Sequence, residues 1–252
     1  MTEPLYRGIV EAFKGVFRVL GMNLDVVGVE NIPTTGGAIL AINHTSYLDF
    51  ALGGVPADMR GRRLVRFMAK DSVFRHPVAG PLMRGMKHIP VDRQDGAQAF
   101  QNAVADAKRG ELIGVFPEAT MSRSLEIKDL KSGAVRIAKA AQVPLIPMIV
   151  FGGHRVLSYG VKDFTRGRTI CMTIGTLMAS SQFTDPEAET LVLRQRLSEL
   201  LDQTIERYPD KPPGASWIPC RLGGSAPSLE EAQAWEEERR ARRAAERDES
   251  QH

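Results

Sequence analysis

The residues of this chain best suited to acid–base chemistry are a histidine and an aspartate that lie five positions apart, His44 and Asp49. They follow an apolar run over residues 38–42 that predicts a strand. Inside one regular helix the two side chains would point about 140° apart around the axis and could not meet. They meet if His44 lies in a turn and a helix starts near Ser46, which places Asp49 one turn inside the positive end of that helix. The carboxylate then orients the imidazole, which can act as a general base.

A purely structural role for the same residues stays open at this point. Ser46 and Asp49 have the spacing of a capping box, in which the acid closes the first turn of a helix. A histidine at the end of a strand with an acid nearby is also structural more often than catalytic. His76, His88 and His154 offer no alternative centre, because they lack the spacing of metal ligands. The choice between catalysis and structure therefore depends on the rest of the chain.

Alternating apolar and amphipathic segments predict the elements that must position this pair. Apolar runs predict strands over residues 24–29, 38–42, 112–116, 144–151 and 169–174. Helical patterns cover residues 96–109, 130–141 and 185–208, the last opened by a capping box at Thr184 with a proline in its first turn. Strands that alternate with helices predict an α/β fold. We expect a single layered domain over residues 23–208, with a mixed sheet flanked by helices and preceded by an amphipathic helix.

The two ends of the chain differ from this alternation of strands and helices. Residues 1–22 contain an amphipathic helix whose apolar stripe consists of Tyr6, Ile9, Val10, Phe13, Phe17 and Leu20. Such a stripe can lie in a membrane interface or pack on the protein's own core, and the pattern does not separate the two. Residues 209–252 form a connector rich in proline and glycine and then a charged tail, with a helix expected over residues 229–247.

Composition and charge limit where the protein can be located and which classes of partner it can bind. No apolar run reaches the length of a membrane span and no apolar signal segment opens the chain, so we expect neither a transmembrane helix nor secretion. Cys171 and Cys220 are expected to be reduced thiols, which fits a peripheral protein on the cytoplasmic face of a membrane. Residues 228–252 carry eight acidic side chains against five arginines in a chain of net charge +3, so the remainder carries +6. This charge suits phosphate esters, CoA or lipid headgroups and is too weak to predict nucleic-acid binding.

Three further blocks follow the His44 block along the chain. Residues 88–93 read His-Ile-Pro-Val-Asp-Arg, residues 117–124 read Pro-Glu-Ala-Thr-Met-Ser-Arg-Ser, and residues 143–147 read Val-Pro-Leu-Ile-Pro. The four blocks lie between residues 35 and 155 and together resemble the glycerolipid acyltransferase family, whose best-known members acylate lysophosphatidic acid. The first block is weakly specific by itself, and the order and spacing of all four make the resemblance specific.

The resemblance implies a role for each matching residue. It makes His44 the base and Asp49 the partner that orients it. It places Arg93 and Glu118 in the acceptor site, together with Thr120 of the third block.

The third block departs from the usual family pattern, which reads Pro-Glu-Gly-Thr-Arg-Ser. Here Ala119 replaces the glycine and Met121 stands where the arginine is expected. Arg123, two positions later, is expected to bind the acceptor in place of that arginine. A guanidinium suits this task because its planar fork donates two hydrogen bonds to a phosphate.

The expected reaction transfers a fatty acyl group from acyl-CoA or acyl carrier protein to a lysophospholipid, with 1-acylglycerol-3-phosphate as the leading acceptor and phosphatidic acid as the product. A lipid hydroxyl is a poor nucleophile, so a neutral imidazole must take its proton as it attacks. A thioester already has a good leaving group, so we expect no covalent enzyme intermediate. The sequence has no metal-ligand spacing and no nucleotide-binding loop, so we also expect no metal and no cofactor. Other lysophospholipid or glycolipid acceptors stay open, as do a non-catalytic lipid-binding protein and a hydrolase that activates water.

Overall fold

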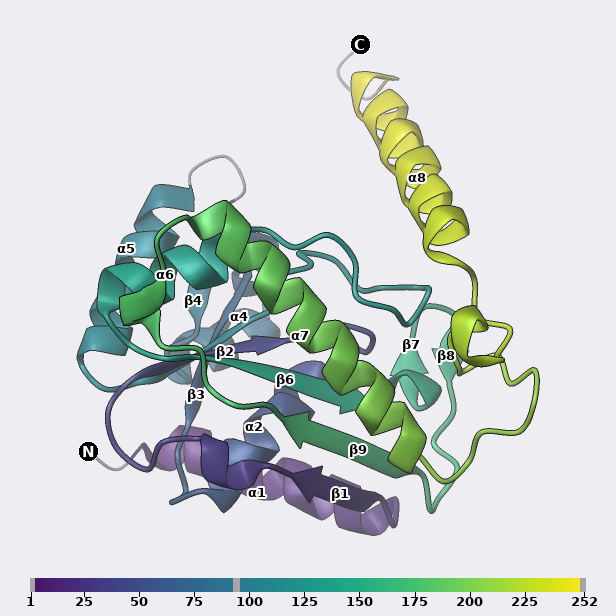
Figure 1. The fold of residues 1–252 in the computed structure, drawn as a ribbon, viewed down its shortest axis with the longest axis horizontal. Helices are drawn as coiled ribbons and strands as arrows, with labels where there is room; N and C mark the ends of the chain where they lie inside the picture. The colour runs from purple at the N-terminus through teal and green to yellow at the C-terminus, as the bar shows by residue number, and fades with distance from the viewer. Residues whose placement is uncertain (1–2, 93–95, 250–252) are drawn as a thin grey trace.

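The computed structural model describes residues 3–92 and 96–249, and these form an α/β fold built on one large sheet (Figure 1). The sheet order is β1 (Asn23–Val27), β9 (Thr169–Ile174), β6 (Leu145–Phe151), β2 (Ala38–Ile42), β5 (Leu112–Val115), β3 (Val65–Lys70) and β4 (Ile89–Val91). Strands β6 and β9 pair antiparallel, and the other neighbours in this sheet pair parallel. The predicted mixed sheet is therefore confirmed.

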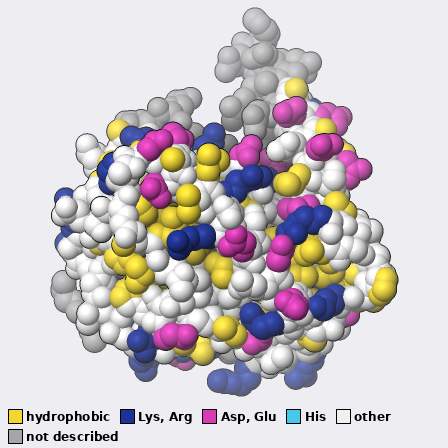
Figure 2. Space-filling view, viewed as in Figure 1, with side chains coloured by type: hydrophobic (Ala, Val, Ile, Leu, Met, Phe, Trp, Pro, Cys, Tyr) yellow, Lys and Arg dark blue, Asp and Glu magenta, His cyan; other side chains and the backbone are white. Residues whose placement is uncertain are grey.

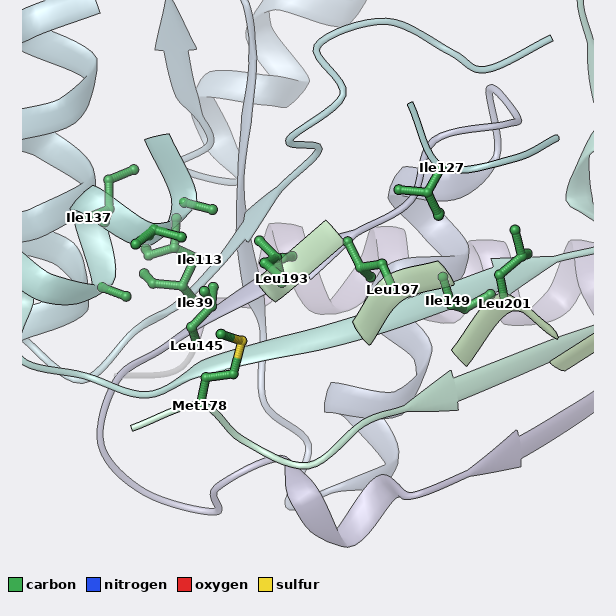
Figure 3. Close-up of a cluster of buried hydrophobic side chains, with 14 of the residues drawn as sticks. Ile39, Ile113, Ile127, Ile137, Leu145, Ile149, Met178, Leu193, Leu197 and Leu201 are labelled. Carbon is green, nitrogen blue, oxygen red and sulfur yellow. The ribbon is translucent and has the colours of Figure 1, made fainter. Parts of the chain in front are cut away.

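Helices cover both faces of the sheet. Helices α5 (Gly96–Lys108), α6 (Gly133–Ala141) and α7 (Pro186–Arg207) lie on one face, and α1 (Pro4–Val19) and α2 (Asp49–Met59) lie on the other. All five residues of β2 are buried, and they alternate between two apolar clusters. Burial on both faces explains why this strand is continuously apolar in the sequence. Figure 3 shows one cluster, in which strand side chains meet those of α6 and α7: Ile39, Ile113, Leu145, Ile149, Ile137, Leu193, Leu197 and Leu201.

Several elements were not predicted from the sequence. They are β3 and β4, the short helices α3 (Asp71–Phe74) and α4 (Ala79–Gly85), and a hairpin of β7 (Leu157–Ser158) and β8 (Val161–Lys162). The apolar pattern of β3 is interrupted by Arg66, whose buried guanidinium pairs with Glu3 at a nitrogen–oxygen distance of 2.5 Å. Strand β4 has three residues and contains Pro90. Neither strand has a clear apolar run in the sequence, so tertiary contacts determine that these two segments form strands.

The C-terminal part of the chain contains the two longest helices. The N-cap of α7 is Asp185 and not the expected Thr184, because the Asp185 carboxylate accepts hydrogen bonds from the backbone N–H groups of Glu187 and Ala188. Helix α8 (Leu229–Glu249) extends away from the body of the protein (Figure 1). Figure 2 shows acidic and basic side chains interspersed on this face of the body, with acidic ones gathered on the described part of α8.

Helix α1 buries part of its apolar stripe in the protein and exposes two further apolar side chains outside the stripe. Tyr6 and Phe17 are buried, and the Tyr6 hydroxyl donates a hydrogen bond of 2.6 Å to the Val65 carbonyl of β3. Val16 and Val19 are 50% and 70% exposed. The helix thus packs on the core along one edge and keeps apolar side chains free along another. Among the described residues, no helix combines the length and the apolar character needed to cross a membrane.

Candidate active site

Strand β2 delivers His44 to the edge of the sheet, and Asn43 fixes the end of that strand. The Asn43 side-chain amide donates to the Val150 carbonyl at 3.1 Å and accepts from the Val150 N–H at 2.7 Å. This two-bond contact joins the end of β2 to β6, a strand 107 residues away in the sequence. The backbone that carries His44 is therefore held by the sheet and not by a free loop.

His44 and Asp49 are in hydrogen-bond contact, as the sequence argument required. The distance from His44 Nδ1 to Asp49 Oδ2 is 2.9 Å, and Asp49 is fully buried. The same carboxylate oxygen accepts from the backbone N–H groups of Thr45 at 2.7 Å and Ser46 at 2.8 Å. Because a carboxylate accepts only, Nδ1 carries the proton and the other ring nitrogen, Nε2, keeps a free lone pair. The His44 side chain is 16% exposed, so the ring reaches the protein surface.

Helix α2 begins at Asp49, three residues later than expected, and this changes how the pair is built. Ser46 lies in the turn before the helix, where its hydroxyl accepts from the Leu48 N–H at 3.0 Å and donates to the Leu157 carbonyl at 2.8 Å. Asp49 is the first helical residue, and its carboxylate turns back onto the preceding turn. The capping contact and the contact with His44 are made by one oxygen atom. The structural and the catalytic interpretations of Asp49 are thus compatible.

Glu118 is buried beneath the histidine loop, where it contacts the backbone. Its two carboxylate oxygens accept from the N–H of His44 at 2.9 Å and from the N–H of Lys128 at 3.2 Å. The Ser122 N–H adds a bond of 2.7 Å to the His44 carbonyl. Burial raises the pKa of Glu118 to about 7, although the backbone N–H groups oppose this shift. Glu118 therefore ties the third block to the first, and the predicted contact with the acceptor remains a prediction.

The raised pKa of Glu118 predicts a pH-dependent stability. Its ordinary value is 4.5, so the fold favours the protonated carboxyl, and this contribution is complete below pH 4.5 and lost as the pH rises through about 7. Between pH 5 and pH 8, the free energy of unfolding of the native protein should fall by about 2–3 kcal/mol relative to Glu118→Gln. Denaturant unfolding at both pH values measures this difference. Parallel pH dependence in the two proteins would refute the assignment.

The residues of the third block that depart from the family pattern, and their neighbours, have the following conformations and contacts. Ala119 has a φ of +62°, in the left-handed region that glycine adopts more easily. Met121, which stands where the family has an arginine, is buried, so this position offers no positive charge to a ligand. The Thr120 hydroxyl accepts from Lys128 Nζ at 2.5 Å and donates to Glu236 of α8 at 3.2 Å. Arg123 stacks on the ring of Tyr159 with 4.2 Å between the guanidinium carbon and the ring centroid.

One predicted residue cannot be placed. Arg93 lies outside the described residues. The remaining predicted site residues converge on one region, because Glu118 and Ser122 bind the backbone of His44 while Thr120 and Arg123 share their loop. Within residues 3–92 and 96–249, no group of three or more histidine, cysteine or acidic side chains is arranged to hold a metal ion.

Two cavities adjoin the loop from His44 to Asp49. The first, which we call the apolar cavity, has a volume of about 350 Å³ between α1 and α2, and Tyr6, Phe13, Phe17, Phe50, Val55 and Leu157 are among its lining residues. The second, which we call the polar cavity, has a volume of about 390 Å³, and its walls include Thr45, Arg123, His154, Arg168, Trp217 and Trp235. Phe50 also contacts the His44 ring, edge to face at 6.5 Å between centroids, and Phe116 stacks on it at 4.4 Å. The loop that carries His44 therefore borders both cavities, and the imidazole itself contacts two phenylalanine rings.

Comparisons with known proteins show the family and the fold of this chain. The family model described as Acyltransferase matches residues 23–151. A 1-acyl-sn-glycerol-3-phosphate acyltransferase of Bacillus subtilis is 28% identical over 212 residues, which cover 82% of this chain and 98% of that protein. A protein of the same description from Limnanthes douglasii is 32% identical over 146 residues, 55% of this chain and 49% of the relative. The crystal structure of the 1-acyl-sn-glycerophosphate acyltransferase PlsC from Thermotoga maritima has the same fold, with a TM-score of 0.67 and 21% identity over 81% of each chain. Since the family model covers half of its length, the chain belongs to the acyltransferase family.

Proposed function

We propose that this acyltransferase moves a fatty acyl group from a thioester of CoA or acyl carrier protein to the free hydroxyl of 1-acylglycerol-3-phosphate. The observation that carries the proposal is the hydrogen bond between His44 and the buried Asp49, which leaves the other nitrogen of a partly exposed imidazole available. The relatives named above support this acceptor, since their descriptions name the same lipid.

The geometry supports a direct transfer without an acyl-enzyme. His44 Nε2 takes the proton of the acceptor hydroxyl as its oxygen attacks the thioester carbonyl. Asp49 stabilises the imidazolium that forms, because its carboxylate already accepts the Nδ1 proton. When the tetrahedral intermediate collapses, the carbon–sulfur bond breaks and the imidazolium returns the proton to the thiolate. The products are an ester and a free thiol, and the histidine is again neutral.

The apolar cavity is suited to a fatty acyl chain. It is lined largely by aromatic and aliphatic side chains of α1 and α2, and one of them, Phe50, also contacts the His44 ring. Lys14 and Asp58 also line it and form an ion pair with each other. Burial of methylene groups in such a cavity gives about 0.8 kcal/mol each. An acyl chain bound there would present its carboxyl end to the histidine.

We propose that α1 also holds the protein on a membrane surface. Val16 and Val19 are half or more exposed, on a helix that carries basic side chains. Changing both to glutamate should weaken binding to vesicles of phosphatidylglycerol and phosphatidylcholine by about tenfold or more, because two apolar contacts are lost and anionic lipid repels the new charges. Co-sedimentation with vesicles measures this binding.

A matched control exists on α7. Leu191 and Val192 are 69% and 40% exposed, so their double change to glutamate adds the same charge and removes a comparable apolar surface. That control should leave vesicle binding within about twofold of the native protein. Equal binding by all three proteins would show that α1 is not the membrane contact.

Acceptor-dependent thiol release tests the proposed activity. Purified protein is mixed with palmitoyl-CoA, with or without 1-acylglycerol-3-phosphate, and free thiol and lipid products are followed. We expect thiol release only with the acceptor, matched by phosphatidic acid. Thiol release at the same rate without acceptor would instead identify a hydrolase. A protein that binds the lipid but releases no thiol with either CoA or acyl-carrier-protein thioesters would be non-catalytic.

A further inference from the structure

The polar cavity contains most of the unpaired polar groups in the described part of the chain. Across the described residues, five buried side-chain nitrogen or oxygen atoms have no hydrogen-bond partner. Four of them belong to residues that line this one cavity, and they are Thr45 Oγ1, Arg123 Nε, His154 Nδ1 and Arg168 Nε. A buried polar atom without a partner costs about 1–3 kcal/mol. Their concentration beside the His44 loop indicates a site built for a ligand.

The arginines of the cavity supply positive charge. Among the described residues no carboxylate pairs with Arg123, whose guanidinium is held against the Tyr159 ring. Arg168 pairs with Asp163, which also lines the cavity, but its Nε is left over. Arg155 of the same wall is paired with Asp210. Arg123 therefore supplies a positive charge that no carboxylate of the described residues balances, and Arg168 supplies a free N–H donor. These two groups suit the oxygens of a phosphate.

His154 supplies a hydrogen-bond acceptor, whereas the arginines of the cavity supply donors. Its Nε2 lies 3.1 Å from the Trp217 carbonyl, and because a carbonyl only accepts, Nε2 carries the proton. Nδ1 is therefore an acceptor without a partner. Burial lowers the pKa of His154 to about 4, so the ring is neutral near pH 7 and does not attract an anion. An acceptor in this position fits a ligand hydroxyl, and the unpartnered Thr45 hydroxyl of the same cavity offers a second contact.

We propose that the polar cavity binds the headgroup of the acceptor lipid, and that beside the bare phosphate of 1-acylglycerol-3-phosphate it also accepts a phosphate that carries a hydroxyl-bearing group, such as phosphoglycerol. This assignment rests on the proposed function. Thr45 lines the cavity and directly follows His44, so the cavity adjoins the loop that carries the proposed base. The volume of about 390 Å³ is that of a small-molecule pocket and exceeds the needs of one phosphate.

A headgroup series tests the hydroxyl contact. The three acceptors have the same acyl chain. In one the phosphate is unsubstituted, in the second it is esterified to glycerol, and in the third it is esterified to propanol. We expect kcat/KM to be at least about tenfold higher for glycerol than for propanol, since only glycerol can donate to His154 and Thr45. His154→Phe and, as a second and more conservative variant, Thr45→Val should each reduce this preference. Equal kcat/KM for the two headgroups in the native protein would overturn the assignment.

Arg123 tests the phosphate contact and separates acceptor from donor. Arg123→Gln should raise KM for the acceptor by about tenfold or more and leave KM for palmitoyl-CoA within about twofold. Arg136, which stacks on Phe100 away from the cavity, is the matched control, and Arg136→Gln should change neither. A rise in KM for palmitoyl-CoA alone would assign the cavity to the donor and refute the proposal. Absence of acceptor-dependent thiol release with every headgroup would instead remove the acyl transfer itself.

Discussion

His44→Ala is expected to lower kcat for acyl transfer by about a thousandfold, because a positioned general base contributes about 10²–10⁴ to such a reaction. The variant removes the imidazole but leaves the backbone contacts of residue 44, which bind Glu118 and Ser122. The loop should therefore keep its conformation, and KM for both substrates should change little. Thiol release from palmitoyl-CoA in the presence of acceptor gives kcat, and thermal unfolding checks that the variant is folded.

His76→Ala is the matched control for this substitution. His76 is an exposed histidine before α4, where its Nδ1 accepts from the N–H groups of Val78 and Ala79. The same side chain is removed, far from the cavities beside His44. We expect kcat within about twofold of the native value. A folded His44→Ala variant as active as this control would show that another residue is the base.

Asp49→Asn should lower kcat by about 10²–10⁴-fold, the range set by loss of imidazole orientation in comparable pairs. The amide keeps one oxygen, so it can satisfy the N–H groups of Thr45 and Ser46 that Asp49 now binds. It cannot stabilise an imidazolium by charge, and its NH₂ group takes the buried position of Asp49 Oδ1, which has no hydrogen-bond partner among the described residues. Steady-state kinetics with the acceptor at saturation measure the loss.

Asp25→Asn removes the same charge elsewhere and serves as the control. Asp25 lies on β1, where it pairs with Arg207 of α7 at 3.0 Å. This partly exposed pair is worth little, so both activity and stability should change only slightly. If Asp49→Asn retained native kcat in a folded protein, the carboxylate would be a helix cap and no part of the reaction.

Local sequence patterns were sufficient for the central strands and the main helices. The β2 run is apolar because both faces of the strand are covered, and that pattern is visible without tertiary information. The contact between His44 and Asp49 also follows from local geometry, since only a turn followed by a helix brings them together. The start of α2 was placed too early because Ser46 is a good N-cap by type. In the structure its hydroxyl is used by the turn itself and by Leu157.

Long-range contacts could not be predicted in the same way. The amide of Asn43 pairs with Val150, and Glu118 reaches His44 across 74 residues. The position of Asn43, directly between a strand and a histidine, was the available signal for the first contact. The polar cavity combines the third block with the β7–β8 hairpin and the start of α8. Its residues share no sequence pattern, and only the fold brings them together.

An acceptor without its reactive hydroxyl gives the most direct test of the central claim, that the hydroxyl of the acceptor is the nucleophile that attacks the thioester. Native protein is given palmitoyl-CoA together with 1-acylglycerol-3-phosphate or with the analogue that lacks the hydroxyl at carbon 2. The account predicts one thiol per molecule of phosphatidic acid with the first and only background thiol release with the second. Equal thiol release with both acceptors would contradict it, because the nucleophile would then be water or the protein.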